Sequence, residues 1–332
     1  MKRITHKLFV ALSVIAPYAA IAQIATIPIQ TDEVASSKEQ QITQEQFAKI
    51  PKLEGGITAM IGVFYATPSA DDVFYAYTAP DGNDVSVLNV DPGYEAGFDV
   101  ALGYIFENSA QSIELLFRDI NTGDTAADSI IEQGKAIDAS SDLNYHLRAA
   151  DVMLGQFIDI GENVQMRLAA GISYAELKQD QETHFVQTNN GNTAQIDGSS
   201  EFKGIGPRIG TDVRYGFNQG FGIVGSGSLA YYLGELNNSL TTADHTGSST
   251  VTDNPDNHAV MNFRGNIGID YIYIFDNAQS STAGIELGYL IDYYDNSIGT
   301  VNNASTTPGL ADNQTTIALS FAGPYVNLKA AF

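Results

Sequence analysis

The chain has 332 residues, and its 39 Asp and Glu outnumber its 16 Lys and Arg, giving a formal net charge of −23. A chain this acidic offers no basic stripe to neutralise phosphates, which argues against a nucleic-acid partner. Cysteine is absent, so disulfides, lipid attachment through cysteine, zinc–thiolate sites and cysteine nucleophiles are excluded. No residue pattern predicts a cofactor or a metal site.

The first 22 residues follow the plan of a secretory signal peptide. Three cations and no acid precede the apolar run LFVALSVIAPYAAIA, which ends in small residues. Pro17 interrupts this run, which is also shorter than the ~20 residues that a membrane-spanning helix needs. Cleavage is predicted after Ala22, and it would leave 13 cations against 39 acids, a formal net charge of −26.

Residues 23–54 form a polar segment that is predicted to lie in the periplasm. Within it, SKEQQITQEQFAKI favours one short helix, with Ser36 or Ser37 near its start and Pro51 beyond its end. Two interpretations remain open for this segment: a leader that precedes the next domain, or a partial plug of it.

From residue 55 to residue 332 apolar and polar residues alternate in ten segments. In FKGIGPRIGTDVRYGF, the face that carries Ile205 and Ile209 is opposite the face that carries Arg208 and Asp212. Alternation of this kind is typical of a transmembrane β-barrel, whose strands never produce a long apolar run. The predicted strands are 55–67, 94–106, 111–120, 143–158, 163–178, 202–217, 220–235, 259–275, 282–296 and 314–332.

Three features favour a barrel over a soluble sandwich. Glycines stand beside charges on the polar faces, aromatic residues recur near strand ends, and the connections alternate between short and long. The sequence therefore predicts an all-β fold, a transmembrane antiparallel up-and-down barrel of about ten strands in a Gram-negative outer membrane. It has short periplasmic turns and long extracellular loops. Two β-rich pieces in 73–88 would raise the count to twelve if they entered the membrane.

The last strand keeps its alternation to the final residue. Leu319 and Phe321 belong to one parity and the later apolar residues to the other, which predicts a β-bulge at Gly323-Pro324. An apolar strand that ends on an aromatic residue also predicts a signal for the barrel-assembly machinery. Its residues are Val326, Leu328 and Phe332.

The less apolar face of each strand is predicted to line the lumen. Its charges fit two hypotheses: rings that set permeation through a pore, or a paired network that fills a narrow barrel. Eight strands are just wide enough for side chains to pack the interior, whereas open channels are secure at about sixteen. Arg148 and Asp151 fall on opposite faces of their strand, and neither is assigned. The predicted pore-lining residues are Glu95, Asp99, Glu114, Arg118, Arg167, Arg208, Asp212, Arg214, Arg264, Asp270, Glu286, Asp292 and Lys329.

Catalysis is not predicted. Asp244-His245 is the one adjacent Asp–His pair, it lies in a polar loop, and no Gly-x-Ser-x-Gly elbow occurs. The acidic clusters at 80–84 and 252–257 do not spell a complete calcium loop and are interpreted as solvated turns.

Several blocks resemble the Legionella-type major outer membrane protein family. They are DPGYEAGFDVALGYIF, LGQFIDIGENVQMRLAAGISYAEL, FKGIGPRIGTDVRYGFNQGFGIVGSGSLAYYLGEL and the closing GPYVNLKAAF. The resemblance implies a porin-like outer-membrane barrel. The better-known porins of the family have cysteines that link subunits, and this chain has none.

The predicted function is passive diffusion of small hydrophilic solutes, with a preference for cations because the loops at the mouth are acidic. The alternative is a closed structural or adhesin-type barrel that binds host or partner molecules through its loops. The expected partners are outer-membrane lipid, lipopolysaccharide and the barrel-assembly machinery, and a homo-oligomer is left open.

Overall fold

A computed structural model describes residues 55–70, 75–78, 86–132, 135–218, 220–252, 256–275, 281–301 and 314–332. The predicted signal peptide and the segment 23–54 lie outside these residues, as do the acidic cluster 80–84 and the centre of the cluster 252–257. None of the described residues forms a helix long and apolar enough to cross a membrane.

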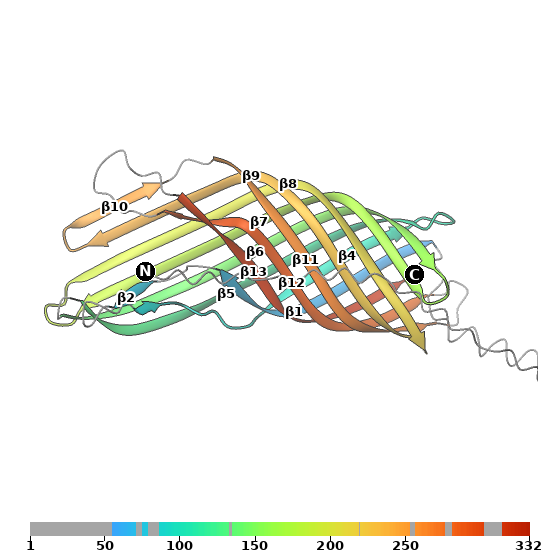
Figure 1. Cartoon of the computed structure of the whole chain (residues 1–332), viewed down its shortest axis with the longest axis horizontal. Helices are drawn as coiled ribbons and strands as arrows, with labels where there is room; N and C mark the ends of the chain where they lie inside the picture. The colour runs from blue at the N-terminus through green and yellow to red at the C-terminus, as the bar shows by residue number, and fades with distance from the viewer. Residues whose placement is uncertain are drawn as a thin grey trace, which may run out of the picture. The chain divides into compact units, whose positions relative to one another are not determined.

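Ten antiparallel strands close into a ring (Figure 1). Its order is β1-β4-β5-β6-β7-β8-β9-β11-β12-β13, and β13 pairs again with β1. The prediction of a ten-stranded barrel is confirmed. The ring strands are β1 (Gly56–Ala70), β4 (Glu95–Ile105), β5 (Gln111–Glu132), β6 (Lys135–Ile160), β7 (Val164–Gln187), β8 (Thr193–Asn218), β9 (Phe221–Asp244), β11 (Asp256–Ile274), β12 (Thr282–Val301) and β13 (Gln314–Ala331).

The three remaining described strands add nothing to the ring count. β2 (Ala76–Thr78) and β3 (Ser86–Leu88) pair with each other in a separate sheet, so the piece 73–88 does not give a twelve-stranded barrel. β10 (Gly247–Thr252) pairs with the last residues of β9, Ser239–Asp244. It lies on the same side of β9 as β11, which pairs with the earlier residues Phe221–Leu236.

The register fixes the width of the barrel. Following paired residues round the ring from Gly204 of β8 leads back to β8 at Gly216, twelve residues along the strand. Strand number and stagger together set the tilt and diameter of a barrel. Ten strands with a stagger of twelve give a lumen only slightly wider than the eight-stranded barrels that side chains fill.

The two ends of the barrel differ. At one end, here called the turn end, the connections between strands are short: 106–110, 161–163, 219–220 and 275–281. The first residues of β1 and the last residues of β13 also lie at this end. At the other, the hairpin end, the predicted connections 121–142, 179–201 and 236–258 are mostly strand, so the predicted strand ends were wrong there. Most residues of these extensions are polar or small, so the extensions lack the continuous apolar face by which the membrane-spanning parts were identified.

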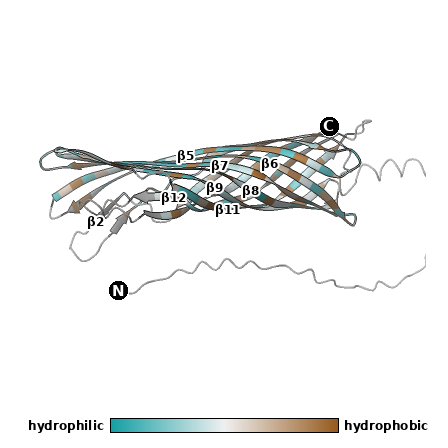
Figure 2. Cartoon of the chain, turned by 90° about the horizontal axis from the view of Figure 1, so that it is seen from above, coloured by the Kyte–Doolittle hydropathy of each residue, from teal (hydrophilic) through white to brown (hydrophobic). Residues whose placement is uncertain are grey.

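The outward face of the ring is apolar. Ile209 and Ile269 are 59% and 55% exposed, and Figure 2 shows apolar and polar residues alternating along the strands. Outward residues of β8 stay apolar or uncharged from Ile205 to Phe217. That stretch rises roughly 30 Å along the axis, at ~3.3 Å per residue and ~40° tilt, which is close to the apolar band of an outer-membrane barrel.

Aromatic residues gather near both edges of this apolar band. Tyr65 stacks on Tyr94 toward the hairpin end, with ring centroids 5.4 Å apart. Tyr273 meets Phe275 edge to face at 5.0 Å at the turn end. Amphipathic rings at these levels suit the boundary between lipid and water.

The bulge predicted at Gly323-Pro324 was wrong. β13 pairs with β12 in one continuous register through these residues, and the irregularity lies in β12 between Tyr294 and Ile298. Leu319 and Phe321 point into the lumen, whereas Val326 and Leu328 point outward. The apolar residues change face because the interior of the barrel is itself apolar at that level.

We expect Ile209→Arg to destabilise the barrel by about 2–4 kcal/mol, because it places a cation against lipid near the midplane. The free energy of unfolding from lipid vesicles in urea measures the effect. Ala127→Arg is the matched control, since Ala127 is exposed on the outward side of the β5 extension beyond the apolar band. Equal losses in the two variants would contradict the assignment of the lipid-facing side.

We expect Phe332→Asp to lower the amount of assembled barrel while export continues. Phe332 extends the seam of the ring, since its N–H donates to Ile57 O at 3.0 Å and its own O accepts from Ile57 N–H at 3.1 Å. Its ring is exposed at the lipid face. Heat-modifiable protein in outer-membrane fractions measures assembly, and a normal level in the variant would show that the end is not a signal.

Candidate functional site

The inward side chains of the ring lie in three successive layers. From the turn end these are a cavity lined by charges, a layer of ion pairs (the ionic layer) and a layer of aromatic and aliphatic residues (the apolar layer). Inward and outward residues alternate on every strand, so each strand contributes to the layers at every second residue.

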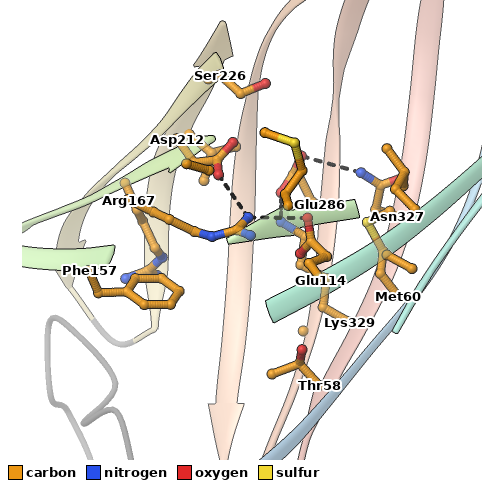
Figure 3. A pocket seen from close by; sticks show the side chains of 18 of the residues that line it. Thr58, Met60, Glu114, Phe157, Arg167, Asp212, Ser226, Glu286, Asn327 and Lys329 are labelled. Atoms are coloured by element: carbon orange, nitrogen blue, oxygen red, sulfur yellow. Dashed lines mark hydrogen bonds and ion pairs between the residues drawn. The ribbon is translucent and has the colours of Figure 1, made fainter. Parts of the chain in front are cut away.

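The cavity has a volume of about 440 Å³, and Gly55, Gly56 and Phe332 are among the residues at its turn-end mouth. In its wall, Arg167 Nη1 donates to Glu114 Oε1 and to Asp212 Oδ2, both at 3.2 Å (Figure 3).

Two features hold the Arg167 guanidinium in place against the wall. The group lies 5.9 Å from the centre of the Phe157 ring, where the face of the ring attracts a cation. Gly155 makes room for it, because a Cβ at that position would clash with Arg167 Nε.

Two more ion pairs line the cavity. Arg214 Nε donates to Asp270 Oδ2 at 2.6 Å, and Lys329 Nζ pairs with Glu286. Tyr325 Oη also donates to Glu286 Oε1 at 2.7 Å, which fixes that carboxylate. Charges of both signs therefore alternate round the cavity, each beside an opposite charge.

The ionic layer joins strands on opposite sides of the lumen. Arg118 on β5 donates to Asp99 Oδ1 at 2.7 Å and reaches Asp292 on β12, although β13, β1 and β4 lie between those strands. Arg264 on β11 donates to the second oxygen of Asp99 at 2.9 Å. Asp99 is thus shared by two arginines, and the bridges cross the lumen.

A second group of side chains completes the ionic layer. Arg208 Nη1 lies 3.4 Å from Asp151 Oδ2, and Arg208 Nη2 donates to Ser228 Oγ at 2.7 Å. Asp151 also accepts from Ser173, whose hydroxyl lies 2.8 Å from Tyr232 Oη. Burying charges is costly unless each one is paired and hydrogen-bonded, and this network provides both.

The apolar layer lies on the hairpin side of the ionic layer. Its large side chains have 0–2% of their surface exposed, and they come from strands all round the ring. In both layers, side chains from strands that are not neighbours meet inside the lumen. The principal members of the apolar layer are Phe64, Ile120, Leu147, Leu177, Phe202, Tyr232, Val260, Tyr294, Leu319 and Phe321.

On the hairpin side of the apolar layer, β12 departs from its regular course at a bulge. Its bulge contains Asn296, whose φ of 54° is a left-handed conformation that Asn adopts more readily than most residues. The backbone N–H of Gly299 then donates to Ser200 Oγ on β8 at 2.9 Å, with β9 and β11 between the two strands. Ala76 of β2 and Tyr75, which precedes that strand, are also buried in the core.

The structure places all but one of the predicted pore-lining residues on the walls of the cavity or in the ionic layer. Glu95 is the exception, since it is exposed at the first residue of β4. Glu114, Arg167, Asp212, Arg214, Asp270, Glu286 and Lys329 line the cavity, and Asp99, Arg118, Arg208, Arg264 and Asp292 belong to the ionic layer.

Sequence reasoning missed Asp151, Tyr232 and Tyr294. Asp151 is buried inward, and Arg148 on the same strand points outward. The two tyrosines belong to Tyr-Tyr pairs on β9 and β12, in which period two sends one ring to lipid and the other to the lumen. Two adjacent tyrosines in an alternating strand are therefore the sequence signal that could have identified one of them as an inward residue.

The sequence matches a protein family described as Legionella pneumophila major outer membrane protein precursor, over residues 49–332. The chain belongs to this family. It is therefore an outer-membrane β-barrel of a Gram-negative envelope, as the resemblance implied. Barrels of this kind have short periplasmic turns and long outer connections, so the turn end is periplasmic and the hairpin end extracellular. No curated protein matches the sequence.

Among solved structures, the outer membrane protease OmpT from Escherichia coli is 13% identical, with a TM-score of 0.44 over 85% of this chain and 99% of that one. A major outer membrane protein from Thermus thermophilus is 10% identical, with a TM-score of 0.33 over 84% and 99%. The Pseudomonas putida toluene transporter TodX is 5% identical, with a TM-score of 0.27 over 83% and 89%.

We expect Arg118→Gln to destabilise the barrel by about 3–5 kcal/mol, because it leaves Asp99 and Asp292 buried without their shared cation. Unfolding from vesicles in urea measures the loss. Arg148→Gln removes an arginine that is 45% exposed and is expected to cost no more than about 1 kcal/mol. A loss for Arg118→Gln as small as that of the control would show that the ionic layer does not hold the barrel together.

Proposed function

We propose that this chain is a closed, non-enzymatic outer-membrane barrel that acts at the cell surface through its extended hairpins. The observation that carries the proposal is the pair of layers across the lumen. Arg118 links Asp99 to Asp292 across the barrel, and fully buried aromatic rings lie directly above that bridge. A solute would have to break buried ion pairs and displace packed side chains to pass.

The hairpin extensions supply the exposed surface that such a function needs. Strands β5 to β9 continue well beyond the apolar band as one curved sheet, joined at its edge by β10. At its tip, hydrogen bonds from Thr246 hold the pKa of Asp244 below its usual range, so this carboxylate stays charged in mildly acidic surroundings.

The charge of these extensions favours a cationic partner. Above the lipid boundary their described residues carry one Lys or Arg, Lys135, against many carboxylates. Those carboxylates are Asp124, Asp128, Glu132, Asp138, Asp142, Asp180, Glu182, Asp197 and Asp244.

Passive diffusion of small hydrophilic solutes is the second candidate, and the cavity of about 440 Å³ at the turn end favours it. In this function the ionic layer would have to open as a gate. Acidic hairpins at the mouth would then enrich cations, and the preference would fade in 1 M salt, where the Debye length is ~3 Å.

We expect the purified full-length barrel to give no discrete conductance steps in a planar bilayer. An open porin reconstituted in parallel controls for insertion, and heat-modifiability shows that the barrel is folded. Discrete steps that lose their cation preference at high salt would overturn the closed barrel and establish passive diffusion.

The surface half of the proposal is tested on intact cells with fluorescent polylysine as the cationic probe. A variant with Asp142, Asp180, Glu182 and Asp197 all changed to Asn should bind less of it at equal surface expression. If the variant and the unchanged protein bound equal amounts of polylysine, the hairpin extensions would not be the contact surface.

A further inference from the structure

Cations are rare on the outward face of this barrel. Of the ten described Lys and Arg residues, six point into the lumen and three point outward, while Lys135 stands on the face that continues the lumen side of β6. Lys135 lies at the tip of a hairpin extension. The three outward cations, Arg148, Lys178 and Lys203, lie together on the adjacent strands β6, β7 and β8.

These three cations sit where the outward face changes from apolar to charged. Arg148, Glu176 and Lys203 are register partners, so they form one row across three strands. The next outward row toward the membrane contains Tyr174 and Ile205, register partners of each other. Headgroups of the outer leaflet lie at this level.

Lys178 stands one outward position above Glu176, on the side away from lipid. Neighbouring strands are ~4.8 Å apart, so the backbones of Arg148 and Lys203, two strands apart, lie within about 10 Å of each other. The three cations therefore form a triangle of the size of a phosphorylated headgroup.

The cations are more accessible than most of the acids beside them. The side chains of Arg148, Lys178 and Lys203 are 45%, 40% and 44% exposed, whereas Glu176 and Glu201 are 19% and 28% exposed. Asp119 and Glu235 continue the row on β5 and β9. Asp119 is 22% exposed and pairs with Arg148 at 3.2 Å, and Glu235 is exposed. In the pairs with Asp119, Glu176 and Glu201 the cation is therefore the more accessible partner. Asp180, which faces away from the membrane, is 45% exposed and pairs with Lys178.

The acids hold the cations in position. Glu176 lies between two of them, 3.9 Å from Arg148 Nη1 and 3.6 Å from Lys203 Nζ. Lys203 Nζ also lies 2.8 Å from Glu201 Oε1. These contacts keep the long side chains along the surface of the sheet.

The surface below the triangle suits acyl chains. Ile172 and Ile205 are each 58% exposed on the lipid face, and Val152 lies beside Ile172 in register. Tyr174 donates from its hydroxyl to Glu176 Oε2 at 3.3 Å, which ties the apolar surface to the charged row. A ligand that fits both levels has anionic groups above and hydrocarbon chains below.

We propose that Arg148, Lys178 and Lys203 bind the phosphate groups of a phosphorylated glycolipid of the outer leaflet. Arginine suits bidentate contact with phosphate, and lysine binds it as a point charge. The acidic hairpin extensions above would repel an anion. Among the described outward-facing residues, this triangle is the one group of neighbouring cations.

The test uses the detergent-purified full-length barrel and bisphosphorylated lipid A, with native mass spectrometry to measure retained lipid. The triple variant Arg148→Gln, Lys178→Gln, Lys203→Gln is expected to bind at least tenfold more weakly than the unchanged protein. Lys135→Gln is the control, since it removes an exposed cation at the tip of a hairpin extension, far from the triangle, and it should bind normally. Dephosphorylated lipid A should bind the unchanged protein as weakly as the triple variant binds the intact lipid.

Glu176→Gln separates recognition from a structural role. Removing the carboxylate between two cations should strengthen lipid A binding, whereas a purely structural contribution predicts weaker binding. Heat-modifiability confirms that each variant is folded. Undiminished binding by the triple variant, equal retention of the dephosphorylated lipid, or competition by millimolar inorganic phosphate alone would overturn the proposal. None of these outcomes depends on whether the lumen conducts.

Discussion

The closure of a ten-stranded ring is the constraint on which the rest of this structure depends. When β13 pairs with β1, every strand of the ring has two neighbours, and the stagger of twelve residues fixes the tilt and the diameter. No water is available in the bilayer core to satisfy an open edge, so a strand-built protein can span it only as a closed ring. Once closed, this ring has an interior that side chains reach across.

That narrow interior dictates how its charges are arranged. Arg118 spans from β5 to β12 because the opposite wall lies within the length of one arginine. A charge in this position is far from bulk water, so it is tolerated only beside an opposite charge. Aromatic rings close the next level, and the bulge in β12 brings Gly299 to Ser200 above them. The inward side chains therefore form an ionic layer and an apolar layer, with a cavity at the periplasmic end.

The outer surface of the ring meets the membrane and its surroundings. It has three levels: an apolar band, a charged row at the upper edge of that band, and acidic hairpin extensions beyond it. Each level is continuous over neighbouring strands because register partners share a face. The few outward cations lie at the middle level, where lipid headgroups are.

The sequence by itself determined the class of fold, the number of ring strands and, for most membrane-spanning strands, the side that faces lipid. Period two fixes the face of every residue once one residue is placed, which is why Ile209 and Arg208 were assigned correctly from the pattern. Apolar–polar alternation failed as a guide where the two faces of a strand have similar surroundings. Beyond the membrane the extensions have water on their outer face, so their strands were mistaken for loops. Within the apolar layer Leu319 and Phe321 were mistaken for lipid-facing residues, because an apolar core and a lipid surface select the same side chains.

Only the tertiary structure decided which charges meet. Asp99 and Arg264 are far apart in the chain, and their contact depends on the ring order and on the stagger, neither of which is encoded in any one strand. The same holds for the outward triangle, whose members come from three strands with no common motif. Local alternation places a residue on a face, whereas closure of the ring decides what lies opposite it.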